Sequence, residues 1–75
     1  RAHVQDLGWL DWVASGQVAG TTGESRRMEA IQIIGPVMYR AHVQDLGWLD
    51  WVNSGETAGT TGQSKRLEAI EIKML

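Results

Sequence analysis

The amino-acid sequence predicts an all-β protein made of two tandem repeats. The string "AHVQDLGWLDWV" occurs at residues 2–13 and again, unchanged, at residues 41–52. Around it, apolar and polar residues alternate with a period of two, which is typical of half-buried strands. Glycine-rich polar stretches separate these runs and are expected to form turns. We therefore expect a single domain over residues 1–75, with a first repeat at 1–39 and a second at 40–75, each of three or four short antiparallel strands.

The repeat extends well beyond that string. Residues 1–34 align with residues 40–73 without a gap, and only eight of these 34 positions differ. Most of the differences are exchanges that a solvent-exposed face tolerates. A fixed internal period of this kind indicates a repeat architecture, in which each copy forms the same local structure.

Two strands are predicted in the first half of each repeat. In the second repeat, "VMYRAHVQ" at 37–44 places mostly small or apolar side chains on one face and mostly polar ones on the other. "WLDWV" at 48–52 is the second strand, and the alternation there puts Trp48 and Val52 on one face and Trp51 on the opposite face.

The second half of the repeat is predicted to be turns followed by a final strand. "SGETAGTTGQS" at 54–64 holds three glycines among small polar residues, so we expect turns around a very short strand. "RLEAIEIKM" at 66–74 is a strand with one strongly apolar face, and "RMEAIQI" at 27–33 is its counterpart. The competing interpretation is a helix over residues 25–34. It is disfavoured because the serine has no capping-box partner and isoleucine recurs at alternate positions.

Composition excludes several classes of function. Seven basic residues against nine acidic ones give no basic stripe for nucleic acid, and no apolar run approaches the roughly 20 residues of a membrane span. Cysteine is absent, and His3 and His42 lie far apart in the sequence, so we expect no disulfide, metal or cofactor. A core of this size is marginal, which favours oligomerisation.

The motifs of the second repeat resemble a known family, the clostridial hydrophobic W (ChW) repeat. The first repeat carries the same pattern with Glu24 and Met28 as its departures, and the resemblance covers essentially the whole chain. The motifs are "Y-x-A-H-V-Q-x-x-G-W" at 39–48, "W-V-x-x-G" at 51–55, "A-G-T-T-G-Q-S" at 58–64 and "R-L-E-A-I-E-I-K" at 66–73.

This resemblance implies an extracellular or cell-surface module of Gram-positive bacteria, found beside wall hydrolases and sugar-utilisation proteins. Such modules are thought to bind carbohydrate or wall polymer, or to mediate adhesion. The family tends to occur in sets of three repeats, and this chain departs from that by having two. The implied architecture is a pseudo-symmetric β-prism completed by oligomerisation, with a β-trefoil-like or propeller-like ring as the alternative.

The tryptophans are the first candidates for function. Trp48 follows a glycine and shares a face with Val52, so we expect it to serve the core. Trp51, beside Asp50, is either a sugar platform, with the carboxylate accepting hydroxyl hydrogen bonds, or a contact to a neighbouring repeat or subunit. The same expectations apply to Trp9, Asp11 and Trp12.

Polar residues on two other segments complete the candidate set. His42 and Gln44 share one strand face, where they either bind sugar hydroxyls or tie the strand to a neighbouring loop. The "AGTTG" string offers hydroxyls and clustered amides for an anionic group, or is simply a tight turn. The ligand-binding candidates from these segments are His3, Gln5, Thr21, Thr22, His42, Gln44, Thr60 and Thr61.

We expect no catalytic activity. Arg66 and Glu68 lie two residues apart on one strand and are interpreted as a structural ion pair, as are Arg27 and Glu29. No pattern places a nucleophile or a second carboxylate beside a histidine. The predicted function is a non-catalytic, multivalent carbohydrate- or cell-wall-binding module that serves as the targeting part of a wall-active protein. The alternative is a structural oligomerisation or surface-adhesion module without glycan binding.

The phase of the repeat leads to a prediction about assembly. Strand residues precede Arg40 but not Arg1, which leaves one edge of the first repeat open. The C-terminal "EIKML" has the alternation needed to complete the first repeat, more readily in a neighbouring chain than in its own. Head-to-tail pairing usually closes into cyclic symmetry, and we expect a homotrimer rather than a dimer.

Overall fold

A computed structural model describes all residues 1–75 and contains eight strands and no helix. It has no helix with the length and hydropathy needed to cross a membrane. The strands are β1 (Ala2–Val4), β2 (Gly8–Trp9), β3 (Met28–Gln32), β4 (Val37–Val43), β5 (Gly47–Trp48), β6 (Val52–Asn53), β7 (Thr57–Gly59) and β8 (Leu67–Met74). The predicted all-β class is therefore confirmed, and the helical alternative for residues 25–34 is excluded by β3.

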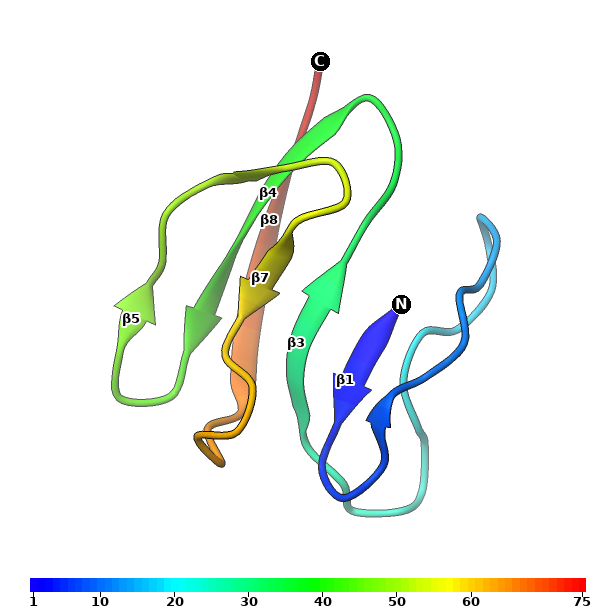
Figure 1. The fold of residues 1–75 in the computed structure, drawn as a ribbon, viewed down its shortest axis with the longest axis vertical. Coiled ribbons are helices and arrows are strands. Elements are labelled where there is room, and N and C mark those ends of the chain that lie inside the picture. Colours follow the sequence, from blue (N-terminus) through cyan, green and yellow to red (C-terminus); the bar gives the residue numbers. More distant parts are fainter.

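The strands form two antiparallel sheets that follow the repeats closely. The first sheet has the order β2-β1-β3-β7, and the second joins β5, β4 and β6, with β8 also paired to β4. Figure 1 shows the first sheet spread across the view, with β8 lying behind β4. In both repeats the strand that carries the "AHV" sequence is central, between a short hairpin strand and the last strand of the repeat.

The hairpin within each repeat depends on two residues in the left-handed backbone region. Asp45 has a φ of 68° and Gly47 a φ of 78°, and Asp6 and Gly8 adopt almost the same values. Glycine reaches this region without steric cost, and aspartate is one of the few other residues that tolerate it. The turn brings His42 directly opposite Trp48, and His3 directly opposite Trp9.

One strand crosses between the repeats. β7 belongs to the second repeat, yet it pairs with β3 of the first, with Ala30 opposite Gly59 and Ile31 opposite Ala58. Gly59 is required by this close approach, because a Cβ there would lie 2.6 Å from the carbonyl oxygen of Glu29. In Figure 1 β7 lies between β3 and the β4–β8 pair, so it joins the two repeats.

The core lies on one face of β4, as the alternation predicts. Val37, Tyr39, Ala41 and Val43 are buried and form a cluster with Ala58 of β7. Ile31 and Ile33 of the first repeat pack against this cluster, so the junction between repeats is apolar. The hydroxyl of Tyr39 accepts a hydrogen bond from the Ile33 amide (3.0 Å) and donates one to the Glu56 carbonyl.

One expectation about local structure is wrong, and a second is wrong within a single chain. The predicted strand 48–52 is interrupted, because β5 ends at Trp48 and pairing resumes only at Val52. Within its own chain the C-terminal strand does not complete the first repeat, because β8 pairs along β4 of its own repeat, from Val43 opposite Leu67 to Val37 opposite Met74. Completion of the first repeat in a neighbouring chain stays a prediction.

Candidate functional site

Each repeat presents an arginine whose guanidinium lies against two tryptophan rings. In the second repeat the Arg40 guanidinium carbon lies 4.6 Å from the centroid of Trp48 and 4.9 Å from that of Trp51. In the first repeat Arg1 lies 5.0 Å from Trp9 and 4.8 Å from Trp12. These are cation–π distances, and the geometry recurs because the residues recur. We call each set of three residues a Trp–Arg–Trp stack.

The strand pattern explains how the stack forms. Arg40 and His42 are two residues apart on the outer face of β4, and the hairpin places Trp48 opposite His42. The His42 and Trp48 rings meet edge to face, with centroids 5.2 Å apart. The break after β5 then lets Trp51 reach the same Arg40 guanidinium. The prediction that Trp48 and Trp51 occupy opposite faces is therefore wrong.

The arginine of each stack is fixed by the last strand of its repeat, but the two repeats differ in charge. Arg40 Nε donates to Glu71 Oε1 at 2.6 Å, whereas Arg1 Nε donates to the neutral amide oxygen of Gln32 at 2.9 Å. The stack of the second repeat is thus close to neutral, while that of the first keeps an uncompensated positive charge.

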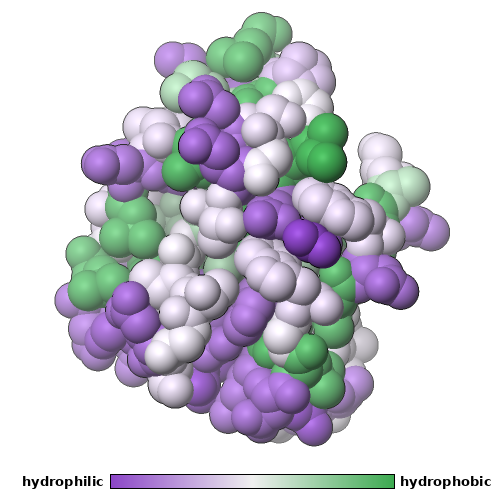
Figure 2. Space-filling model, in the orientation of Figure 1, coloured by the Kyte–Doolittle hydropathy of each residue, from purple (hydrophilic) through white to green (hydrophobic).

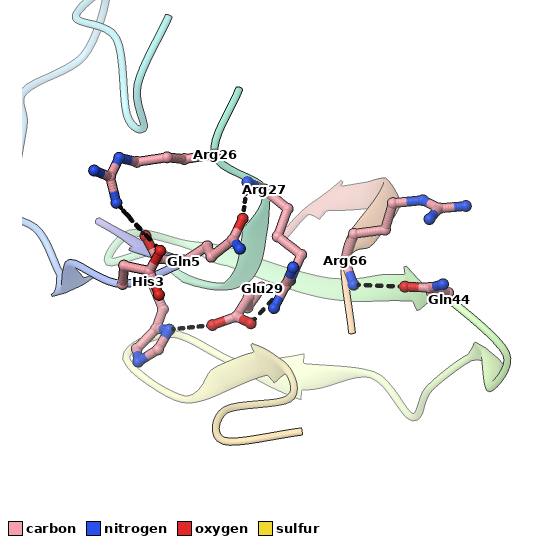
Figure 3. Close-up of polar contacts among 8 residues, drawn as sticks. His3, Gln5, Arg26, Arg27, Glu29, Gln44 and Arg66 are labelled. Carbon is pink, nitrogen blue, oxygen red and sulfur yellow. Dashed lines mark hydrogen bonds and ion pairs between the residues drawn. The ribbon is translucent and has the colours of Figure 1, made fainter. Parts of the chain in front are cut away.

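A histidine–glutamate–arginine chain continues each stack across the sheet. Figure 3 shows Glu29 between His3 and Arg27, with its carboxylate oxygens 3.2 Å from each partner. The His3 contact is an ion-pair distance without the alignment of a hydrogen bond. In the second repeat, Glu68 lies 3.1 Å from both His42 and Arg66. The structural interpretation of the Arg–Glu pairs agrees with this geometry, and the histidines are anchored by the same carboxylates.

The indoles of the stacks are exposed to solvent. Trp12 is 45% exposed, Trp48 42% and Trp51 37%, while Trp9 is half-buried. The expectation that Trp48 serves the core is wrong, because Tyr39 and small aliphatic residues fill the core instead. An exposed pair of indoles with a cation against both rings can stack on the apolar face of a sugar ring and attract hydroxyl oxygens.

The other predicted ligand residues fall into three groups. Asp11 and Asp50 are exposed beside the stacks and form no ion pair within the chain. The side-chain oxygens of Gln5 and Gln44 accept hydrogen bonds from the main-chain amides of Arg27 and Arg66, as Figure 3 shows, so they hold the strands together. The threonine hydroxyls divide by position: those of Thr21 and Thr60 are buried without a partner, whereas Thr22 and Thr61 are exposed.

Sequence reasoning missed Arg1 and Arg40. The signal was present, because each arginine lies two residues before a histidine on a strand of period two and therefore shares its face. What the pattern did not reveal was the interruption after β5, which is needed to bring Trp51 onto that face. Glu71 and Gln32 were missed for a related reason, since their roles follow from the register of β8 and β3.

A hollow of about 400 Å³ lies beside the first stack, lined in part by Arg1, Trp12, Gly16 and Ile31. In the second repeat the corresponding place, between β6 and the end of β8, is occupied by residues 37–39 of β4. No three histidine, aspartate or glutamate side chains gather where they would hold a metal ion.

Comparison with protein families decides the identity of the repeats. The model of the clostridial hydrophobic W family matches residues 3–34 and 42–75. The chain belongs to this family. It carries two tandem ChW repeats, and repeats of this family often occur in cell-surface proteins. Neither the comparison with curated proteins nor the comparison with solved structures found a match.

Proposed function

We propose that these ChW repeats form a non-catalytic carbohydrate-binding module that attaches to bacterial cell-wall polymers. The observation that carries the proposal is the exposed Trp–Arg–Trp stack, which occurs once in each repeat with nearly the same geometry. Sugar-binding sites commonly combine an exposed aromatic face with a few polar groups around it. Here Asp11 and Asp50 adjoin the second indole of each stack and are free to accept hydroxyl hydrogen bonds.

Two similar sites on one chain suit a polymeric ligand. A glycan held at one stack reaches the other at a high effective concentration, which raises avidity without additional contacts. Membership of a family common in cell-surface proteins supports an extracellular or surface location, with the module as the targeting part of a longer wall-active protein.

Retention on isolated cell walls and a glycan array tests this proposal. The variant Trp12→Ala/Trp51→Ala removes one indole from each stack, and we expect the apparent affinity to fall about 30-fold, for about 1 kcal/mol per lost aromatic contact. The matched control is Leu7→Ala/Leu46→Ala, which shortens two apolar side chains of similar exposure outside the stacks. No retention of the native chain on any wall or glycan, or equal losses in both variants, contradicts the proposal.

The second candidate is a structural oligomerisation or adhesion module that binds no glycan. It is favoured by the apolar residues exposed at the end of the chain, among them Ile72, Met74 and Leu75. In Figure 2 some of the exposed hydrophobic residues lie at the upper end of the molecule, where Figure 1 places the C-terminus. In this proposal the repeats close into a β-prism-like ring as a homotrimer. Quencher access to the tryptophans separates the two functions, because indoles protected in the assembled protein favour the structural role.

A further inference from the structure

The junction between the two repeats has a defined geometry that occurs once within the chain. β3 of the first repeat receives β7 of the second, with Gln32 opposite Thr57, Ile31 opposite Ala58 and Ala30 opposite Gly59. The amide of Thr60 also donates to the Glu29 carbonyl at 3.2 Å. Ala58 is only 3% exposed as a result, and Ile33 packs against the core of the second repeat.

The chain carries a second copy of both halves of this junction, and neither half has a partner. β8 is the counterpart of β3, but it pairs with β4 alone, and Ile72, the counterpart of Ile33, is 54% exposed. Residues 18–20 are the counterpart of β7, but they form no strand, and residues 18–21 make no main-chain hydrogen bond. At Gly20 an added Cβ would meet only the end of the Met28 side chain, whereas at Gly59 it would meet backbone.

We propose that the free edge of β8 pairs with residues 18–20 of a second copy of this chain, in the register of the internal junction. That register places Glu71 opposite Val18, Ile70 opposite Ala19 and Ala69 opposite Gly20. Thr21 then donates its amide to the Glu68 carbonyl, as Thr60 does to Glu29. The pairing covers the exposed face of Ile72, and it does not depend on glycan binding.

The occupant is a second copy because the two halves cannot meet within one chain. In Figure 1 the loop that contains residues 18–20 lies beyond β1, at the opposite side of the molecule from β8. β3 and β7 lie between this loop and the β4–β8 pair. β8 is similar in sequence to β3, and residues 18–20 are similar to β7. Because β3 and β7 already pair, the two free segments have complementary sequences. Such a contact is head-to-tail, and it closes into a ring or continues as a filament.

Engineered cysteines test the register cleanly, because the chain has none of its own. In the variant Val18→Cys/Glu71→Cys, mild oxidation is expected to link separate chains into covalent dimers and larger species. Gln32→Cys/Thr57→Cys is the positive control, since these side chains lie 2.9 Å apart within one chain and are expected to give a linked monomer. Val18→Cys/Lys73→Cys shifts the register by two residues and is expected to link poorly.

The pattern of disulfide linkage decides whether the proposed register is right. Chain-to-chain linkage that is much stronger for Val18→Cys/Glu71→Cys than for the shifted pair supports the proposal. Equal linkage in the two, or linkage of the first pair within a single chain, overturns it.

Sedimentation at micromolar concentration gives an independent reading without oxidation. Ile72→Lys places a charge on the face that the second copy covers, and we expect it to convert the oligomer to a folded monomer. Ile34→Lys is the matched control, because Ile34 is similarly exposed and its counterpart in the second repeat is already Lys73. A native chain that remains monomeric, or an oligomer that survives Ile72→Lys, overturns the proposal.

Discussion

The Tyr39 hydroxyl makes the sharpest stability prediction, because its two hydrogen bonds connect the two repeats and can be removed while the buried ring is kept. The ring is fully buried, and its hydroxyl accepts from the Ile33 amide and donates to the Glu56 carbonyl. Tyr39→Phe keeps the ring and removes both bonds. Each lost bond costs about 1 kcal/mol, and the Ile33 amide is left partly buried without a partner. We therefore expect a loss of about 2 kcal/mol, or roughly 8–16 °C in Tm for a domain of this size.

Thermal and urea unfolding followed by circular dichroism measure this loss, with all variants at one protein concentration because assembly adds to apparent stability. Ser54→Ala is the control, since the Ser54 hydroxyl accepts only one exposed hydrogen bond, from the Gly35 amide. Its loss is expected to stay below about 0.5 kcal/mol. A Tyr39→Phe variant that unfolds within about 0.5 kcal/mol of the native protein refutes the idea that this hydroxyl holds the junction.

Three further predictions compare equivalent or neighbouring positions, each by the same unfolding measurements. Glu29→Gln is expected to lower the free energy of unfolding by about 2 kcal/mol and Glu68→Gln by less than about 1 kcal/mol, because Glu29 is buried between His3 and Arg27 while Glu68 is partly exposed. Equal losses in the two variants argue against a role for burial. Gly59→Ala is expected to lower the free energy of unfolding by about 2 kcal/mol more than Gly62→Ala. Both glycines have positive φ, but only at Gly59 would the added Cβ collide with main-chain atoms. Similar losses mean that the two strands move apart to make room for the Cβ. Ile34→Lys is expected to change stability by less than about 0.5 kcal/mol, and a larger loss indicates that Ile34 packs against something.

The sequence predicts the strands well where a regular alternation covers a long run. The period of two gives β4 and β8 almost to the residue, and the buried face of β4 with its valines and Tyr39. The repeat itself transfers these assignments to β1 and β3. The Arg–Glu pairs also follow from spacing, because residues two apart on a strand share a face.

Short segments were harder to predict, because long-range pairing rather than local pattern decides them. Nothing in "WLDWV" shows that the strand stops after Trp48, and this interruption brings Trp51 to Arg40. The hairpin register, which the pattern also does not reveal, places the expected core tryptophan Trp48 opposite His42 on the outer face of β4. Likewise, Thr57–Gly59 forms a strand because β3 is available to it, whereas the nearly identical residues 18–20 do not. The pairing of β8 with β4 of its own repeat is also a choice of partner strand that alternation alone leaves open.

The binding role of the Trp–Arg–Trp stacks is tested most directly by NMR observation of the four indole N–H signals during titration with cell-wall glycan fragments. Each signal is assigned by single Trp→Phe variants, and the main-chain amides of the core around Tyr39 serve as an internal reference. We predict that the Trp12 and Trp51 signals shift in a saturable manner, while the core amides stay in place. Glycan fragments that bind without moving either signal, or that move all four signals and the core together, contradict the assignment of the stacks as the glycan site.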